Sequence, residues 1–347
     1  MARHRRRAGP ARHPVPAVRA RMTTAPHPVL IQPGAPQDMA GPGWQRTTAQ
    51  GATMGTGWHL TCWSAPGLPD PVPIVHAACA ETIALFSLWS RDSAVSRFNH
   101  AAPGWHRLPA PVIALLNDSL RLCDLTSGAL DPTLGRLADL WGFGPSGPVT
   151  APPEPEALEA ARGACGRARL RLQGAHVFQP GGLWLDFGGI AKGWAVDLAS
   201  QRLSTSGLSI HLIEIGGEIA ARGLSPEGQP WWIDIETPPA AALPRCLAAV
   251  HGMALAGSGC WRRRSGAGAG WSHTLDPATG QPCDEAVLSA HVFHPRAALA
   301  DAWASALMVL PPEDALALAT AQSLPALLTL RNGVRRSACL SDWEDAA

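Results

Sequence analysis

Apolar residues recur three or four positions apart in five stretches of the chain, which is the spacing of an amphipathic α-helix. The second stretch begins near Pro111 and is followed by Gly128, and the third stops at Gly207, as is typical of helix starts and ends. A further short helix is expected after the proline-rich loop 144–157. The five main predicted helices cover residues 74–88, 111–126, 192–207, 298–310 and 312–321.

Short runs of alternating apolar and polar residues, rich in β-branched and aromatic side chains, predict strands. Residues 177–187 (VFQPGGLWLDF) have the pattern of a hairpin that turns at Pro-Gly-Gly. The strands do not alternate regularly with helices, so the pattern predicts an α+β fold with mixed or antiparallel sheets, and not a doubly wound one. The other strands are expected within residues 52–63, 210–223, 229–236, 253–261 and 289–294.

Residues 1–44 show no periodic pattern and are rich in proline and arginine, so we expect a disordered leader before one folded domain over residues 45–340. The first 22 residues hold seven arginines and no acid, although the whole chain has a formal net charge of only +1. The remainder is therefore net acidic, which argues against a nucleic-acid-binding surface. Translation that begins at Met22 is an alternative explanation of the leader.

The leader lacks the apolar segment of a signal peptide, and the sequence contains no run of about 18 apolar residues. We therefore expect a cytoplasmic protein without a transmembrane segment. The eight cysteines form no C-x-x-C pair, so their spacing indicates neither a zinc module nor a disulfide framework.

The stretch LDFGGIAKGWAVDLAS at residues 185–200 contains Lys192, the only lysine of the sequence. Asp186 is expected at the end of a strand, Gly188 and Gly189 in a tight turn, and Lys192 at the start of a helix. Backbone N–H groups at a helix N-terminus favour an anion, and glycines let a phosphate approach closely. The spacing matches neither the P-loop nor the dinucleotide-binding fingerprint. The stretch alone predicts a strand-to-helix turn that could bind an anion.

Asp301 and Ser305 are four residues apart in the predicted helix 298–310 and so share one face. A carboxylate and a hydroxyl are oxygen ligands that suit Mg²⁺ or Ca²⁺ better than zinc. The alternative is structural: an aspartate near a helix N-terminus complements the helix dipole.

Ser258, His273 and Asp276 suggest a hydrolase triad, but the nucleophile elbow G-x-S-x-G is absent. His273 alone is equally consistent with a structural histidine. Asp131 and Pro132 are expected to open a short helix that ends at Trp141.

Eight motifs occur in an order that, over residues 50–310, resembles the ApbE-type FAD:protein FMN transferases. They are Met54-Gly55-Thr56, SRFN, LDPTLGRLADLWGFG, LDFGGIAKGWAVD, IGGEIAARG, SGCW, HTLDPATGQP and ADAWASAL. The resemblance implies an α+β architecture of the T-fold type in two intimate lobes.

The resemblance also implies a Mg²⁺-dependent transferase that takes FAD as its substrate. Such an enzyme leaves FMN attached through its phosphate to a Thr or Ser hydroxyl of an acceptor flavoprotein subunit, and releases AMP. The acceptor would carry a short motif of the Asp-Gly-Ala-Thr kind.

Site residues are carried over only where the motifs match. Metal ligands fall at Gly189, through its carbonyl, Asp301 and Ser305. His273 and Lys192 are the expected catalytic residues, with His273 as base or proton shuttle. The expected FAD-binding residues are Met54, Trp89, Ala129, Leu130, Asp131, Asp186, Lys192 and His273.

The sequence departs from the family pattern at a few positions. Trp58 and Trp194 stand where tyrosine is common, Gly257 replaces a Thr, Ser305 replaces the usual Thr ligand, and Glu218 replaces an Asp. Two further functions therefore stay open beside flavin transfer. One is a Mg²⁺-dependent FAD pyrophosphatase, and the other is a non-catalytic FAD-binding carrier.

Overall fold

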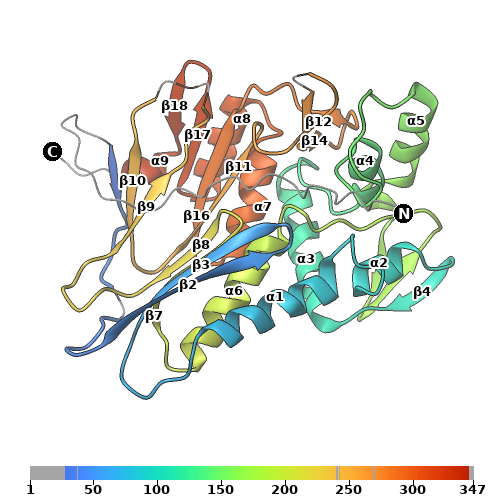
Figure 1. The fold of residues 1–347 in the computed structure, drawn as a ribbon. Helices are drawn as coiled ribbons and strands as arrows, with labels where there is room; N and C mark the ends of the chain where they lie inside the picture. The colour runs from blue at the N-terminus through green and yellow to red at the C-terminus, as the bar shows by residue number, and fades with distance from the viewer. Residues whose placement is uncertain (1–27, 37, 240, 242, 269, 344–347) are drawn as a thin grey trace, which may run out of the picture.

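An eight-stranded antiparallel sheet forms the centre of the molecule (Figure 1). The computed structural model describes residues 28–343 except 37, 240, 242 and 269. Every pair of neighbouring strands in this sheet is antiparallel. In spatial order the strands are β18 (Gly333–Arg336), β17 (Ala326–Leu330), β16 (Ser289–His294), β11 (Ala254–Gly259), β8 (Glu218–Arg222), β7 (Ile210–Ile215), β3 (Thr56–Ser64) and β2 (Gln45–Thr53).

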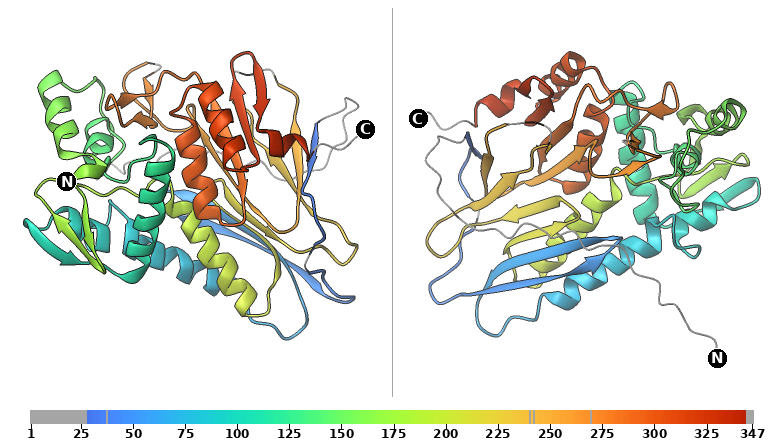
Figure 2. Two further views of the ribbon diagram at one scale, coloured as in Figure 1. Left: turned by 180° about the vertical axis from the view of Figure 1, so that it is seen from behind. Right: turned by 45° about the horizontal axis from the view of Figure 1, so that its top comes forward.

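Four helices pack on one face of this sheet (Figure 2, left). Small residues of α6, such as Ala195 and Ala199, lie against Ile213 and Ile215 of β7 in one apolar cluster. Side chains alternate between the two faces of a strand. Leu212, the residue before Ile213, therefore joins a different cluster on the opposite face. The four helices are α1 (Val72–Phe86), α6 (Ala191–Thr205), α7 (Ala297–Leu307) and α8 (Pro312–Ala321).

A smaller sheet, in the order β1–β10–β9, covers the opposite face together with α9 (Ala338–Ser341). Strand β1 (Val29–Ile31) runs parallel to β10 (Cys246–Val250), which pairs antiparallel with β9 (Trp231–Ile235). Leu30 is completely buried in this layer. The expected disorder is therefore wrong for the described residues between 28 and 44, because Val29–Ile31 form a strand and Leu30 fills a core; residues 1–27 lie outside the described part of the chain.

The second lobe holds a three-stranded sheet in the order β4–β6–β5 and four helices. Asn99 joins it to the rest of the molecule, since its side chain exchanges hydrogen bonds of 2.9 and 2.8 Å with the backbone of Leu185. One apolar cluster runs from this lobe to α7 and α8, so the two lobes share a core. The elements are α2 (Ala94–Asn99), β4 (Gly104–Arg107), α3 (Ala110–Leu125), α4 (Gly135–Leu140), α5 (Pro155–Ala164), β5 (Arg171–Gln173) and β6 (His176–Gln179).

The α+β fold class and the five main helices are confirmed, but two strand predictions are wrong. The hairpin over 177–187 does not form: β6 pairs with β4 and β5, and Trp184 bridges Leu134. The run 52–63 is not one strand, because Met54 and Gly55 both have positive φ and turn the chain back between β2 and β3. None of the helices in the described part of the chain is both long and apolar enough to cross a bilayer.

Candidate active site

The N-terminus of α6 stands at the centre of the predicted site. Asp186 lies in an extended segment, not in a regular strand, and accepts a 2.7 Å hydrogen bond from the Gly188 N–H. The turn that follows leads into α6 at Ile190, whose side chain cannot cap the helix. The free N–H groups of this helix end therefore need acceptors from elsewhere in the molecule.

Helix α7 supplies one of these acceptors. Asp301 Oδ2 accepts a 3.1 Å hydrogen bond from the Gly193 N–H. In return, the Asp197 carboxylate of α6 accepts bonds of 2.7 and 3.0 Å from the N–H groups of Ala297 and Ala298, at the start of α7. Each helix thus caps the other, and Asp301 complements the dipole of α6, since it lies beyond the first turn of its own helix.

Gly193 allows this close crossing of the two helices. A Cβ at this position would stand 2.2 Å from the Ala297 carbonyl oxygen and 2.7 Å from the Ala298 Cα. Any side chain larger than hydrogen would therefore push α7 away and separate the Asp301 carboxylate from the Gly193 N–H.

Lys192 forms an ion pair with Glu218, and its Nζ lies 4.0 Å from Asp301 Oδ1. Burial favours the neutral amine, but the charges of Asp301 and Glu218 outweigh it and raise the pKa of Lys192. Burial also raises the pKa of Glu218, to about 8, although Lys192 opposes the shift. Burial likewise raises the pKa of Asp301 against the effect of Lys192. The group is a desolvated cluster of two carboxylates and one ammonium.

Glu218 is a site residue that the motif comparison noted only as a departure. It is 1% exposed, and its Oε2 has no hydrogen-bond partner among the residues that the structure describes. A buried carboxylate oxygen without a partner is costly unless a cation or another donor joins it. The tight Gly216-Gly217 turn before β8 gave a hint of this position, but the partner Lys192 is 26 residues away in sequence.

Ser305 lies between Gly189 and Ser258. Its Oγ is 3.2 Å from the Ser258 Oγ. A Cβ on Gly189 would be only 2.9 Å from the Ser305 Oγ, so the absence of a side chain brings the GGIAKG turn directly onto α7. Three predicted metal ligands, Gly189, Asp301 and Ser305, thus come from one turn and one helix face that meet.

The donor set fits Mg²⁺. The candidate ligands are one carboxylate, one hydroxyl and one carbonyl, and no group of three or more His, Cys, Asp or Glu side chains arranged to hold a metal occurs among the described residues. Mg²⁺ is commonly held by one or two carboxylates and keeps several waters or phosphate oxygens as its remaining ligands. The unpartnered Glu218 Oε2 is a second carboxylate oxygen available nearby.

The turn between β2 and β3 borders this cluster. Met54 packs against the core beneath α6, and its φ of 47° is in the left-handed region. At Gly216, a Cβ would lie 2.9 Å from Thr56 Cγ2 and 3.3 Å from Lys192 Cδ. The first predicted motif and the lysine are therefore neighbours, as the resemblance implied.

The segment Ala129-Leu130-Asp131 lies beside Asp186, because the Asp186 N–H donates a 2.9 Å hydrogen bond to the Pro132 carbonyl. Asp131 does not open a helix as expected, since α4 begins only at Gly135. Its Oδ1 instead accepts bonds of 2.8 and 2.6 Å from the backbone and side chain of Thr133. Asp131 thereby fixes the loop against Asp186.

Trp89 follows α1, and its side chain is 61% exposed. An exposed indole offers a face on which a flat ring can stack. Among the described residues, no hydrogen bond or ring contact joins Trp89 to the Lys192 cluster, so its role in flavin binding stays a prediction.

His273 lies near the same cluster and is held neutral. Burial, together with the positive charges of Arg263 and Lys192, lowers the pKa of His273 to about 4. Its buried Nδ1 has no hydrogen-bond partner among the described residues. The Ser-His-Asp triad is not assembled: Ser258 contacts Ser305, while Asp276 holds its own turn through Ala278 and Thr279.

The departure at Gly257 has a structural reason. Gly257 pairs with His291 across β11 and β16, and a Cβ on Gly257 would lie 2.6 Å from the His291 Cδ2. The buried imidazole of His291 occupies the space that a threonine side chain would need.

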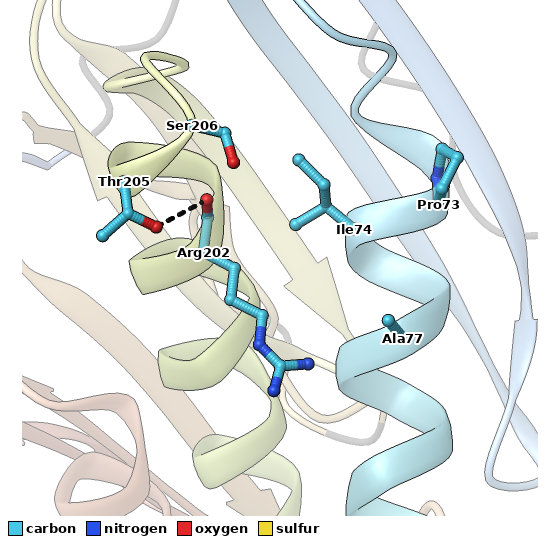
Figure 3. A pocket seen from close by; sticks show the side chains of 6 residues that line it. All are labelled: Pro73, Ile74, Ala77, Arg202, Thr205 and Ser206. Atoms are coloured by element: carbon cyan, nitrogen blue, oxygen red, sulfur yellow. Dashed lines mark hydrogen bonds between the residues drawn. The ribbon is translucent and has the colours of Figure 1, made fainter.

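A shallow pocket of about 400 Å³ lies elsewhere, between α1 and the C-terminal end of α6 (Figure 3). Pro73, Ile74 and Ala77 line one wall, and Arg202, Thr205 and Ser206 line the other. Lys192 is at the opposite end of α6, about 15 Å away at 1.5 Å per residue. The pocket is therefore not part of the predicted flavin site.

Comparisons with known proteins show the family of the chain. The sequence profile of the ApbE family matches residues 54–328. The FAD:protein FMN transferase of Vibrio cholerae is 33% identical over 290 residues, covering 81% of this chain and 86% of its own. That of Klebsiella pneumoniae is also 33% identical, covering 85% and 87%.

Solved structures show the same architecture. The flavin transferase ApbE from Vibrio cholerae superposes with a TM-score of 0.79 at 32% identity, covering 86% of this chain and 99% of that one. The apo flavinyl transferase ApbE of Pseudomonas stutzeri gives 0.78 at 32% identity, covering 87% and 98%.

Fold and site thus define a protein of the flavin transferase class. The chain belongs to the ApbE family, as its motif order predicts.

Proposed function

We propose that this protein is a Mg²⁺-dependent FAD:protein FMN transferase, which moves FMN from FAD onto a Thr or Ser hydroxyl of an acceptor protein and releases AMP. The observation that carries the proposal is the meeting of Lys192, Glu218, Asp301 and Ser305 at the N-terminus of α6, where two buried carboxylates hold a half-buried ammonium beside a hydroxyl. Its support also includes relatives that bear this name.

Asp301, Ser305 and the Gly189 carbonyl would hold Mg²⁺, with Glu218 near them. Mg²⁺ bound there supplies a Lewis acid that neutralises charge on the pyrophosphate oxygens. Lys192 is kept protonated by its carboxylate neighbours and adds a fixed positive charge on the same side. Asp186 and the 129–131 segment, joined through Pro132, would hold the nucleotide part of FAD.

The acceptor hydroxyl attacks the phosphorus on the FMN side of the pyrophosphate. A new P–O bond forms, the P–O bond to the bridging oxygen breaks, and AMP leaves with that oxygen. His273 is the base that takes the hydroxyl proton, since burial and the charges of Arg263 and Lys192 lower its pKa to about 4 and leave the imidazole unprotonated at neutral pH. A positioned base of this kind is worth about 10²–10⁴-fold in rate.

The test combines purified protein, FAD, Mg²⁺ and an acceptor domain that carries an Asp-Gly-Ala-Thr motif. The mixture is denatured and run on a gel, flavin fluorescence of the acceptor band is recorded, and AMP is measured in solution. A fluorescent band that requires Mg²⁺ and is lost when the motif threonine is replaced by valine is the expected result.

A dark acceptor with AMP released would replace this proposal by FAD hydrolysis, in which water takes the place of the hydroxyl. A dark acceptor without AMP, although FAD binds, would replace it by a carrier function.

A further inference from the structure

Three consecutive arginines, Arg262, Arg263 and Arg264, follow β11 and lead into the hairpin of β12 (Arg264–Ser265) and β13 (Trp271–Ser272). The two outer arginines are neutralised, since Arg262 forms an ion pair with Glu236 and Arg264 with Glu285. The guanidinium of Arg263 is exposed and makes no ion pair or hydrogen bond with any residue in the described part of the chain.

The backbone holds Arg263 beside the candidate base, because its carbonyl accepts a 3.1 Å hydrogen bond from the His273 N–H. Its charge also reaches across the site: it lowers the pKa of His273 and opposes the burial that raises the pKa of Asp186. The charge of Arg263 thus acts on two groups that lie in different motifs.

Without Arg263, the side chains of the site offer an incoming anion little uncompensated positive charge. Lys192 is already compensated by Glu218 and Asp301. An incoming pyrophosphate carries two negative charges and meets these carboxylates and Asp186 nearby. A guanidinium is always charged and can donate two parallel N–H bonds to phosphate oxygens, which a lysine cannot do.

We propose that Arg263 is a substrate-binding residue whose guanidinium, held beside His273, clamps the pyrophosphate of FAD. This assignment rests on the proposed flavin transfer and adds to it a residue outside the motif-derived site. Arg262 and Arg264 are each paired with a glutamate. The middle arginine, Arg263, is therefore the one of the three that can bind an anion.

The experiment compares Arg263→Gln with Arg262→Gln, a matched control one residue away whose charge is neutralised by Glu236. Affinities for FAD, ADP and riboflavin are measured by titration calorimetry, with Mg²⁺ and with EDTA. ADP offers the pyrophosphate without the flavin, and riboflavin offers the flavin without phosphate. Thermal unfolding confirms that each variant is folded.

Arg263→Gln is expected to weaken FAD and ADP binding by about 10- to 100-fold, the usual loss for a hydrogen bond to a charged group. Riboflavin binding stays unchanged, and Arg262→Gln binds all three as the parent does. Arg263→Lys recovers part of the loss, since it restores charge but not the two-pronged geometry.

Equal FAD and ADP affinities in Arg263→Gln and the parent would overturn the assignment. So would an equal loss for riboflavin, which indicates a structural role, or a parent protein that binds neither FAD nor ADP. The proposed function is judged separately by covalent flavin on the acceptor. A parent that binds ADP through Arg263 but never labels the acceptor would retain the clamp and reject the transfer.

Discussion

The two ends of helix α6 carry charges of the same kinds in different surroundings. At the N-terminal end, Lys192 meets Glu218 and Asp301, whose side chains are only 2% and 4% exposed. At the C-terminal end, Arg202 pairs with Glu81, and both side chains are more than one-third exposed. The two cations are about equally exposed, at 32% and 35%, so the difference lies in the carboxylates: Glu81 keeps its water, whereas Glu218 and Asp301 are buried and one Glu218 oxygen has no partner among the described residues.

The burial of the carboxylates thus distinguishes the proposed binding cluster from an ordinary surface ion pair. Desolvated charges interact strongly and are costly to leave incomplete. An exposed pair adds little to stability and is screened by salt. Changes at the two ends of the same helix should therefore differ in both activity and stability.

The largest effect is expected on flavin transfer, when the two capping carboxylates, Asp301 and Asp197, are replaced one at a time. Asp301→Asn removes the charge but keeps an oxygen for the Gly193 N–H, whereas Asp197→Asn keeps an acceptor for only one of the two N–H groups at the start of α7 and so tests the loss of a cap. Asp301→Asn should reduce flavin transfer by at least about 10³-fold, because several kcal/mol of charge stabilisation at the metal site are lost. Asp197→Asn should keep the specific activity of its folded protein. Similar losses in both variants, in a transfer assay with matched unfolding curves, would show that Asp301 acts only through helix packing.

Gly193→Ala is the next largest change. The added methyl group would meet the backbone of Ala297 and should lower the free energy of unfolding by roughly 3 kcal/mol or more, at the upper end of overpacking costs. Gly163→Ala in α5 is the control, since a Cβ there meets nothing within 4 Å and should stabilise the helix slightly. Urea denaturation measures both. A Gly193→Ala protein as stable as the parent would contradict the close crossing.

His211 of β7, which contacts Ser200 of α6, gives a pH-dependent effect. It is buried, its Nε2 and Nδ1 contact Ser200 Oγ and the Leu208 carbonyl, and burial lowers its pKa to about 4. Because the unfolded chain takes up this proton near pH 6.5 and the folded chain does not, stability present above pH 6.5 is lost as the pH falls towards 4. The loss from this group should reach about 2–3 kcal/mol.

The control for this prediction is His211→Gln, which cannot take up the proton. His273 and His291 titrate in both proteins, so the difference between the two pH–stability curves isolates His211. Two parallel curves would contradict the prediction.

The smallest effect is expected at the C-terminal end of α6. Arg202→Gln should change the free energy of unfolding by less than about 1 kcal/mol, as for other exposed pairs, and should leave transfer unchanged. A fall in activity would show that the pocket beside Arg202 takes part in the reaction, and would break the contrast between the two ends.

Much of the fold followed from local pattern. The 3.6-residue period located the helices because one face of each is buried against the sheet, as Ala195 and Ala199 show. The prediction of a hairpin at 177–187 was wrong because the second half of this segment does not pair with the first. It is extended and forms a bridge to Leu134 instead. The local sequence pattern does not distinguish a hairpin from an extended segment that pairs elsewhere.

The site divides in the same way. Asp186, Gly189 and Lys192 lie in one stretch and were found together. Glu218 and Arg263 become visible only in three dimensions, because their significance depends on which distant charges reach them. Motif order identified the family, but it could not show which charges lack partners.

The reciprocal caps of α6 and α7 tie the lifetime of the site to that of the helix crossing. The amides of Gly193, Ala297 and Ala298 are all held by carboxylates of the opposite helix. Such amides exchange with solvent hydrogen only when both helix ends open together, so they form one cooperative unit. A cation held by Asp301 would slow exchange at Ala297 and Ala298, although neither amide touches it. The rate of this local opening, and not the rate of the reaction, then limits how long the site stays assembled.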